Sequence, residues 1–290
     1  MKKSRKLATL GICSALFLGL AACQQQHATS EGTNQRQSSS AKVPWKASYT
    51  NLNNQVSTEE VKSLLSAHLD PNSVDAFFNL VNDYNTIVGS TGLSGDFTSF
   101  THTEYDVEKI SHLWNQKKGD FVGTNCRINS YCLLKNSVTI PKLEKNDQLL
   151  FLDNDAIDKG KVFDSQDKEE FEILFSRVPT EATTDVKVHA EKMETFFSQF
   201  QFNEKARMLS VVLHDNLDGE YLFVGHVGVL VPADDGFLFV EKLTFEEPYQ
   251  AIKFASKEDC YKYLGTKYAD YTGEGLAKPF IMDNDKWVKL

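Results

Sequence analysis

The sequence has few cysteines: there are five in 290 residues, and two of them, Cys13 and Cys23, lie near the N-terminus. The others are Cys126, Cys132 and Cys260, an odd number, so at least one thiol must be free. Cys126 and Cys132 fall within one helical pattern, in which six residues rise ~9 Å, more than a disulfide spans. The scarcity excludes a disulfide scaffold, and stability must come from a hydrophobic core.

Positive charge is also scarce, with 31 Lys and Arg against 40 Asp and Glu and a formal net charge of −9. Proteins that bind nucleic acid neutralise its phosphates with Lys and Arg, so this balance argues against nucleic acid as a partner. The sequence lacks a Gly-rich phosphate loop and a zinc-type cysteine pair. The acidic clusters at 153–155 and 283–285 and the partial calcium-loop pattern at 214–219 lack the ligand spacing of a metal site. We therefore expect no metal and no cofactor.

The apolar run Leu7–Leu20 is too short and too poorly flanked to span a membrane. It follows a basic N-terminus, as the apolar part of a secretory signal does. The run ends in Leu20-Ala21-Ala22-Cys23, which resembles the lipobox of bacterial lipoproteins. That resemblance implies cleavage before Cys23 and attachment of diacylglycerol to its sulfur. We expect residues 1–22 to be a signal peptide, and the mature protein to be lipid-anchored at the extracellular face of the cell membrane.

Residues 24–42 contain almost nothing that could be buried, and their polar composition predicts a disordered tether. With the lipidated Cys23 the tether covers 23–42, and a chain of that length spans roughly 25 Å. The rest of the chain shows neither an internal repeat nor a second core. We therefore expect a single folded domain at 43–290.

Helical patterns dominate the first half of this domain. Ser57 and Glu60 form a capping box that opens a short helix, and Asp70-Pro71 opens a second, with proline at its first position. A third helix is indicated between Tyr105 and Trp114, and another at 186–200. Residues 148–152 fit either a strand or a helix start, and the Asp/Lys-rich run at 153–170 predicts surface loops. The apolar stripe of the second helix is Val74, Phe77, Phe78, Val81 and Tyr84.

After residue 207 the apolar period changes from that of a helix to that of a strand. Strands are expected at 208–214, 220–231, 237–244 and 249–254, with turns at Asp218-Gly219 and at 232–236. Ser256 then caps a helix, and a terminal strand is indicated near 280–288. The fold class is therefore α+β, with a helical N-terminal half packed on an antiparallel sheet.

A candidate nucleophile lies where a loop meets a helix. Asn125 is a good N-cap, so Cys126 would occupy the first helical position. There the free backbone N–H groups and the helix dipole favour a thiolate over a thiol. Ile128, Tyr131 and Cys132 recur at i, i+3 and i+4 and give the helix a buried face. The alternative is that Cys126 is a small buried residue without chemistry.

A histidine and a carboxylate stand inside apolar strands further along the chain. His226 lies between Gly225 and Gly228, and glycines within a strand mark a close approach to the backbone. A four-residue loop at 232–235 would place His226 opposite Glu241, on the same face of the sheet. A five-residue loop would place Lys242 there instead. His226 could also be a buried, hydrogen-bonded histidine, and Glu241 could face solvent.

Six further histidines compete with His226. His214 is the main rival, since it ends its strand beside the turn at 215–219, at the rim of the sheet. The others lie in the tether or on polar helix faces and loops: His27, His68, His102, His112 and His189.

The order of these groups resembles the papain-like NlpC/P60 superfamily, in which a cysteine at a helix N-terminus precedes a histidine on a central strand and a polar residue on the next. His226-Val227-Gly228 and Val240-Glu241 are similar to its motifs. The chain also looks like an uncharacterised family of Gram-positive surface lipoproteins, a domain of unknown function. The first resemblance implies a papain-like core, with Cys126, His226 and Glu241 catalytic. In that superfamily the third residue is more often His, Asn or Gln.

These roles amount to nucleophilic acyl transfer. Cys126 would attack a carbonyl as thiolate, His226 would take and return a proton, and Glu241 would fix the imidazole tautomer. The Cys126 N–H would donate half of an oxyanion hole. Asn125 and Trp114 are close enough in the chain to supply the other half.

Three function classes follow. The first is a membrane-anchored thiol hydrolase of the cell envelope that cleaves amide bonds, most naturally in peptidoglycan stem peptides. The second is a binding or adhesion lipoprotein that keeps the fold without catalysis. The third, a solute-binding lipoprotein of a transporter, would need two α/β lobes, and the sequence shows no repeated βα alternation.

Overall fold

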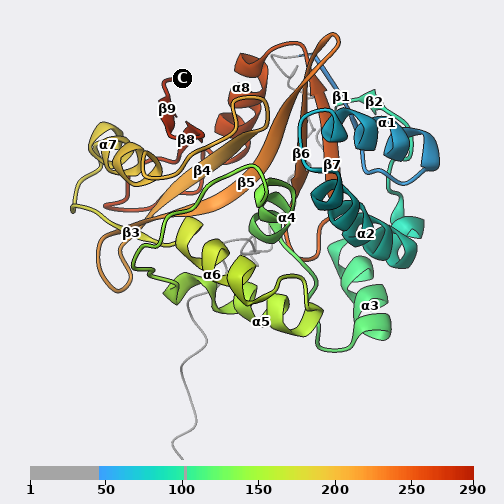
Figure 1. Ribbon diagram of the computed structural model, residues 1–290, viewed down its shortest axis with the longest axis horizontal. Helices are drawn as coiled ribbons and strands as arrows, with labels where there is room; N and C mark the ends of the chain where they lie inside the picture. Colours follow the sequence, from blue (N-terminus) through green and yellow to red (C-terminus); the bar gives the residue numbers. More distant parts are fainter. Residues whose placement is uncertain (1–45, 101–102) are drawn as a thin grey trace, which may run out of the picture. The chain divides into compact units, whose positions relative to one another are not determined.

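The structure is a computed structural model, and it describes residues 46–100 and 103–290 (Figure 1). The expected signal peptide at 1–22, the lipidation site Cys23 and the tether at 23–42 lie outside the described residues, as do His27 and His102. Within the described ranges, no helix has both the length and the apolar character that crossing a membrane requires.

The described chain has eight α-helices, seven of them before residue 207 and the eighth between the strands that end at 254 and begin at 280. Their bounds are α1 Gln55–Ser66, α2 Pro71–Val88, α3 Val107–Lys118, α4 Cys126–Leu134, α5 Phe151–Gly160, α6 Ser165–Leu174, α7 Val186–Phe197 and α8 Lys257–Lys267. There are also two 3₁₀ turns in the described chain. η1 at Gly89–Thr91 directly follows α2, and η2 at Gln148–Leu150 directly precedes α5.

Nine strands of the described chain form one antiparallel sheet. Eight of them follow the order β2-β1-β7-β6-β5-β4-β8-β9, and β3 pairs with the beginning of β5. The α+β class is therefore confirmed. The strands are β1 Ala47–Thr50, β2 Thr98–Ser99, β3 Val178–Pro179, β4 Arg207–Asp215, β5 Tyr221–Ala233, β6 Gly236–Lys242, β7 Tyr249–Phe254, β8 Phe280–Asp283 and β9 Lys286–Val288.

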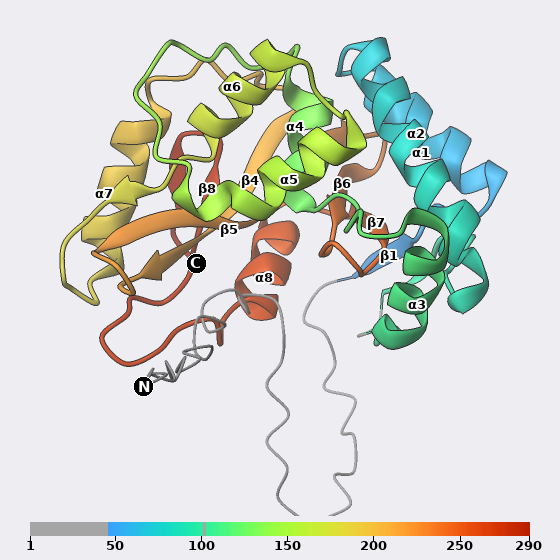
Figure 2. The ribbon, with the colours of Figure 1, turned by 90° about the horizontal axis from the view of Figure 1, so that it is seen from below.

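The two faces of the sheet bury different cores. The larger core joins residues of α1 to α7 to one face, where Val227, Val229 and Val240 alternate along the central strands. The smaller core joins Leu230 and Phe239, on the other face, to α8. Figure 2 shows α8 on one side of the strands and α4, α5 and α6 on the other. Alternate residues of β5 and β6 therefore point into different surroundings.

Local capping rules predicted several helices correctly. Asp70 accepts a hydrogen bond from the Ser73 N–H at 3.0 Å and Pro71 begins α2, as expected, and the whole predicted stripe from Val74 to Tyr84 is buried. The first helix begins earlier than predicted, because Asn54 and not Ser57 is its N-cap. The Asn54 side chain accepts from the Ser57 N–H at 2.9 Å.

The predicted surface loops at 153–170 are wrong. Most of this run is helical, in α5 and α6, and Asp153 is 0 % exposed. Asp153, Ala156 and Ile157 recur at i, i+3 and i+4 and share the buried face of α5. The many charged residues around them conceal that stripe. The C-terminus also holds two strands, β8 and β9, where a single one was expected.

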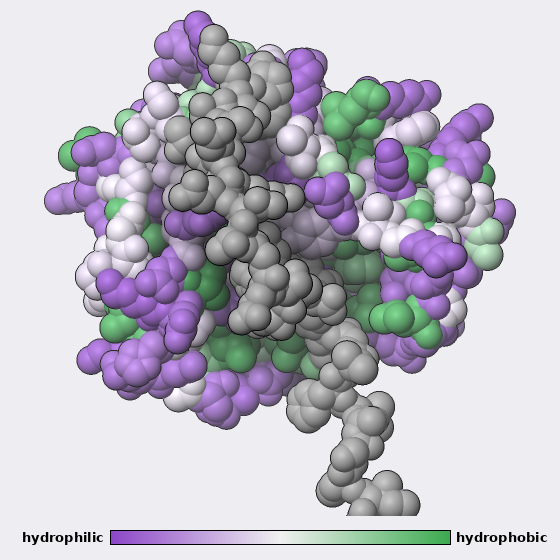
Figure 3. All heavy atoms as spheres, turned by 180° about the vertical axis from the view of Figure 1, so that it is seen from behind, coloured by the Kyte–Doolittle hydropathy of each residue, from purple (hydrophilic) through white to green (hydrophobic). Residues whose placement is uncertain are grey.

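The surface seen from behind Figure 1 is largely hydrophilic, with separate hydrophobic patches between the polar side chains (Figure 3). Large hydrophobic side chains that stand out into solvent are scattered along the described chain. They are Val56, Val107, Val122, Phe151, Leu217, Tyr271 and Leu290.

Candidate active site

Cys126 is the first residue of α4, as predicted. Asn125 has an extended backbone, and its side-chain oxygen accepts from the Ile128 N–H at 3.1 Å, which fixes where the helix begins. The N–H groups of the first turn have no acceptor within the helix. They give the end of α4 that carries Cys126 a partial positive charge. The Cys126 residue is 6 % exposed.

The sheet opens where α4 meets it. Pairing between β5 and β6 runs from Ala233↔Gly236 to Val229↔Val240 and ends there, so β6 pairs with only the second half of β5. α4 contacts both strands. Its side chains bond to carbonyl groups of the first half of β5. Arg127 Nη1 donates to the Val224 oxygen at 3.0 Å, and Ser130 Oγ donates to the Val227 oxygen at 3.2 Å.

A β-bulge turns His226 toward this opening. Val211 of β4 pairs with His226, but the next residue, Val212, pairs with Val224, so Gly225 is the extra residue. Paired residues share a face, and Val211 and Val212 belong to opposite cores. His226 therefore lies on the face covered by α8, although Val224 lies on the other. A Cβ atom on Gly225 would come within 2.3 Å of the Leu213 side chain, so a larger residue there would force that side chain to move.

Glu241 also lies on the α8 face, but the predicted loop length is wrong. Ala233 pairs with Gly236, so Asp234 and Asp235 form a two-residue turn. In this register the position opposite Glu241 is that of Gly228, two residues beyond His226. The error of two residues keeps the side chain on the same face, and His226 and Glu241 become diagonal neighbours.

His226 and Glu241 are joined by a hydrogen bond of 2.5 Å between Nε2 and Oε2. The other carboxylate oxygen accepts from the Tyr263 hydroxyl at 2.5 Å and lies 3.5 Å from the Lys267 ammonium. Tyr268 stacks on the imidazole, with ring centroids 4.8 Å apart. α8 supplies Tyr263 and Lys267, and Tyr268 directly follows its last residue. The sequence analysis did not assign these three residues to the site.

Cys126 and His226 shift each other's pKa toward the charged form. Burial acts to raise the pKa of the Cys126 thiol, but the charge of His226 and a hydrogen bond with its side chain outweigh burial and lower the pKa. Burial likewise acts to lower the pKa of His226, but Cys126 and then Glu241 raise it to about 9. Because Nε2 of His226 faces Glu241, Nδ1 is the nitrogen left for the sulfur. The geometry favours a thiolate–imidazolium pair.

Glu241 stays ionised despite its burial. Desolvation acts to raise its pKa, but Lys267 and the hydrogen bonds from His226 and Tyr263 lower it to about 2. At neutral pH the ionised carboxylate can therefore accept a hydrogen bond from the Nε2–H of His226. That hydrogen bond fixes the tautomer and leaves Nδ1 to exchange a proton with Cys126.

Both side chains expected near the oxyanion already donate elsewhere. Trp114 Nε1 gives its only hydrogen to the Phe121 oxygen at 2.6 Å. Asn125 Nδ2 donates to Asp153 at 2.8 Å, which leaves its second hydrogen. The Cys126 N–H lies in the first turn of the helix, where it has no acceptor within α4. Asn125 as an oxyanion donor stays a prediction.

Lys242 is a second buried charge that follows Glu241 on β6 and points to the opposite face. Its ammonium donates to the oxygens of Thr244 and Phe245 at 2.8 and 3.2 Å, and also to that of Glu247. The Tyr84 ring lies 4.2 Å away. Burial lowers its pKa to about 7, against the charges of Glu246, Glu247 and Cys126. Lys242 organises the segment 243–248 beside the loop that leads into Cys126.

The rival histidine, His214, is engaged elsewhere. Its Nε2 lies 2.7 Å from Glu220, its Nδ1 accepts from the Ala277 N–H at 3.1 Å, and its ring contacts that of His189. Both histidines are buried, His189 at the start of α7 and His214 in β4, so neither the expected rim position of His214 nor the polar position of His189 is correct.

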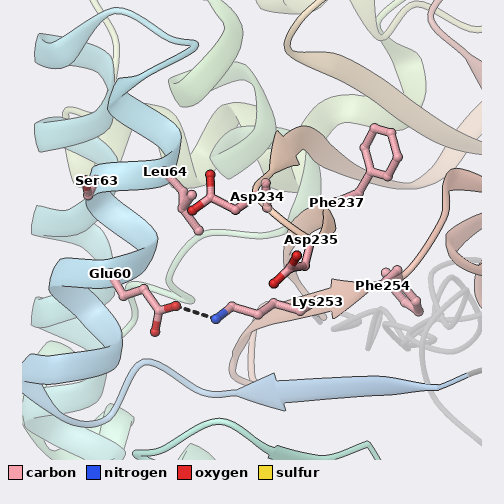
Figure 4. A pocket seen from close by; sticks show the side chains of 9 residues that line it. Glu60, Ser63, Leu64, Asp234, Asp235, Phe237, Lys253 and Phe254 are labelled. Atoms are coloured by element: carbon pink, nitrogen blue, oxygen red, sulfur yellow. Dashed lines mark hydrogen bonds and ion pairs between the residues drawn. The ribbon is translucent and has the colours of Figure 1, made fainter.

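A surface pocket lies apart from these groups, between α1 and the β5–β6 turn (Figure 4). Glu60 and Lys253 form an ion pair across it, and Asp234 and Asp235 reach it from the turn. Its lining includes neither Cys126 nor His226. Within residues 46–100 and 103–290, no group of three or more His, Cys, Asp or Glu side chains is arranged to hold a metal ion.

Comparison with known proteins identifies a family but no activity. The family described as a domain of unknown function (DUF4300) matches residues 48–288, and the chain belongs to this family. No curated protein and no solved structure shows a significant match to the chain.

Proposed function

We propose that this member of the DUF4300 family is a cysteine hydrolase that cleaves amide bonds, with Cys126 as nucleophile, His226 as general acid and base, and Glu241 as the residue that orients His226. One observation carries the proposal: a thiol at a helix N-terminus, an imidazole on a strand and a buried carboxylate on the next strand form one interacting chain of groups. The thiolate–imidazolium pair is the activated form of a cysteine nucleophile.

The reaction would proceed in two halves. The Cys126 thiolate attacks the amide carbonyl carbon, the C–N bond breaks, and the His226 imidazolium gives its proton to the leaving nitrogen, which departs as an amine. The product is a thioester on Cys126. Neutral His226 then takes a proton from water, the resulting hydroxide attacks the thioester, and the carboxylic acid leaves as thiolate and imidazolium are restored.

The negative oxygen of each tetrahedral intermediate needs hydrogen-bond donors. The Cys126 N–H at the start of α4 is the first, and one such donor typically contributes ~3 kcal/mol to the transition state. The remaining hydrogen of Asn125 Nδ2 is our candidate for the second. Asp153 holds that amide at 2.8 Å, which orients it before the substrate arrives.

The order and roles of the three groups support the finer proposal of a papain-like, NlpC/P60-type core. A helix that begins with the nucleophile and packs against an antiparallel sheet carrying the other two groups is the arrangement which that resemblance implies. Glu241 departs from the superfamily's usual His, Asn or Gln. Its buried contacts with Tyr263 and Lys267 suit an anion at that position.

Location and substrate class rest on the N-terminal sequence. The signal at 1–22 and the lipobox-like Leu20-Ala21-Ala22-Cys23 support an anchor in the cell membrane with the domain on its outer side. Amide bonds within reach of such an anchor include those of peptidoglycan stem peptides, which we propose as the substrate.

Replacing Cys126 tests the function, and α4 offers a matched control. Purified peptidoglycan is incubated with the full chain, and newly released amino groups and peptides are measured by amine labelling and mass spectrometry. Cys126→Ala should lower release by at least about 1000-fold, whereas Cys132→Ala, also in α4 and buried, should retain it. Equal release by wild type and Cys126→Ala, or no release by wild type, would overturn the proposal.

The burial of the site favours a second candidate, a non-catalytic binding lipoprotein. Cys126 is 6 % and His226 2 % exposed, so a substrate must displace part of the covering chain. Alkylation of the wild-type protein with iodoacetamide at pH 7 separates the two functions. Fast labelling of Cys126 relative to Cys132 supports the hydrolase, and equal slow labelling of both supports the binding protein.

A further inference from the structure

Asp153 is a buried carboxylate beside the candidate nucleophile. It lies in the first turn of α5, and its side chain is 1 % exposed. Three donors reach it. Asn125 Nδ2 and Arg127 Nε bond to Oδ1 at 2.8 and 2.9 Å, and Arg127 Nη2 bonds to Oδ2 at 2.7 Å. The two residues that flank Cys126 in the chain are therefore tied to the same carboxylate.

The Arg127 guanidinium continues this connection to the strand that carries His226. Its remaining terminal nitrogen, Nη1, donates to the Val224 oxygen at 3.0 Å. Val224 stands directly before Gly225, the bulge residue that turns His226 across the sheet. One planar group thus joins α5, the start of α4 and the bulge of β5. A guanidinium can do so because its five donors diverge in fixed directions.

The place of this link explains why it is needed. β6 pairs only with the second half of β5, and β3 pairs only with Tyr221 and Leu222, so among the described strands no ladder holds the segment 223–228 on that side. The hydrogen bonds from Arg127 and Ser130 replace the ladder bonds. Without Asp153, the Arg127 side chain would lose the bidentate partner that fixes its plane.

The charges around the thiol indicate that the effect of Asp153 is geometric. The groups that act on Cys126 are His226 from β5, Arg127 from α4, Asp153 from α5, and Lys242 from β6. Arg127 lowers the pKa of the thiol and Asp153 raises it. By its charge alone, Asp153 would therefore oppose the thiolate. Any support it gives must come from placing Cys126 and His226 together.

We propose that Asp153 is a positioning residue, which aligns the Cys126 sulfur with the His226 ring through Asn125 on one side and Arg127 on the other. This inference rests on the proposed function, since it assigns Asp153 to the same thiolate–imidazolium pair. It concerns the geometry of the pair and makes no use of the substrate.

The sign of the effect distinguishes positioning from charge. In Asp153→Asn the negative charge is lost, so a purely electrostatic role predicts a lower thiol pKa and faster alkylation at low pH. A positioning role predicts the opposite, because the thiolate moves away from the imidazolium. We expect the apparent pKa of Cys126 to rise by about one unit, which lowers its alkylation rate about tenfold at pH values below the wild-type thiol pKa.

The measurement is the pH profile of iodoacetamide labelling of Cys126 in the full chain, followed by peptide mass spectrometry. Asp167→Asn is the matched control, since Asp167 forms an ion pair with Lys135 at the other end of α4. It should leave the profile unchanged. Arg127→Lys keeps the charge but cannot bond in a bidentate way, and it should shift the profile in the same direction as Asp153→Asn.

Circular dichroism of each variant shows whether it folds. An unchanged or lowered thiol pKa in folded Asp153→Asn overturns the proposal. If Asp153→Asn does not fold, folded Arg127→Lys decides, and an unchanged profile there also overturns it. If neither variant folds, Asp153 is a folding residue and the proposal is wrong.

The same profiles separate this inference from the proposed function. If wild type releases no peptide and yet Asp153→Asn raises the thiol pKa, the hydrolase is rejected and the positioning role stands. If wild type hydrolyses peptidoglycan and the profile of Asp153→Asn is unchanged, only the positioning role fails. An ordinary thiol pKa in wild type removes both.

Discussion

The two ends of α4 each carry a buried cysteine, and they differ in chemistry. Cys126 and Cys132 are 6 % and 3 % exposed, so both are shielded from water to a similar degree. Burial raises the pKa of Cys132 to about 12, with a small opposing effect of Lys135. At Cys126 the effect of burial is reversed by His226, and the pKa lies below that of an ordinary thiol.

The difference shows what activation requires in this fold. A low-dielectric surrounding penalises any unpaired charge, and the same surrounding strengthens the attraction between a thiolate and an imidazolium. The thiolate of Cys126 is favoured despite its burial because the charge and hydrogen bond of His226 lower the thiol pKa. Cys132 lies further along α4, and Cys260, on the α8 side, also has a raised pKa because it is buried.

Removing the imidazole should make the two cysteines alike. In His226→Ala, Cys126 retains the helix N-terminus but loses its counter-charge. We expect its alkylation rate to fall about 100-fold at pH values below the wild-type thiol pKa, equivalent to a thiol pKa about two units higher. Labelling by iodoacetamide with peptide mass spectrometry measures both cysteines in one sample, and Cys132 is the internal control. A rate within twofold of wild type would show that His226 does not activate the thiol.

Glu241→Gln should have the next largest effect. The amide keeps the shape of the side chain but removes the charge that helps to hold His226 protonated. We expect the pKa of His226 to fall and the alkylation rate of Cys126 to drop about tenfold at pH values below the wild-type thiol pKa. The change in Cys132 should be negligible. If the labelling of Cys126 keeps its wild-type pH profile, the carboxylate does not contribute to the thiolate–imidazolium pair.

The local part of the site was predictable from the sequence. Asn125 as N-cap and Cys126 at the first helical position follow from a side chain and the backbone three residues away. The four-residue loop expected at 232–235 also placed His226 and Glu241 on one face of neighbouring strands, although the turn is two residues shorter. The geometry places all three groups together, and their catalytic roles stay predictions.

The non-local part was not predictable. The β5–β6 turn is two residues long, pairing of these strands ends at Val229↔Val240, and α4 contacts both of them. Strand pattern alone does not show where pairing stops. The charged neighbours of Asp153 predict a solvated residue, but it is buried. Its i, i+3, i+4 spacing with Ala156 and Ile157 was the signal that could have identified it.

The pH dependence of His226 provides a smaller and more specific test. Its pKa is raised to about 9, and Cys126 raises it more than Glu241 does. In Cys126→Ser the thiolate is absent, so the imidazolium should lose its proton at lower pH. We expect a downward shift of at least about one unit, measured from the histidine ring signals by NMR. The difference between the two proteins should appear as pH falls from about 9, where the wild-type ring is half protonated, to the lower pKa of the variant.

The resonance of His189 provides the reference in that titration. Its ring bonds to Thr180 and Thr183 and lies away from Cys126, so its titration should not respond to the substitution. A His226 pKa that is the same with serine and with cysteine would mean that the sulfur is neutral in the folded protein. The contrast between the two ends of α4 would then not arise from an ion pair.

Lys242→Met should change the reactivity of Cys126 least, although it removes a buried charge next to Glu241 in the chain. The ammonium is directed at the carbonyl oxygens of Thr244, Phe245 and Glu247, on the face opposite His226. We expect the alkylation rate to change by less than about threefold. Stability should fall by about 1–3 kcal/mol, because buried carbonyls lose their donor, and a urea titration measures this loss. A large fall in labelling with unchanged stability would instead make Lys242 part of the charge balance at the thiol. The difference between Cys126 and Cys132 would then depend on two cations, one on each face of β6.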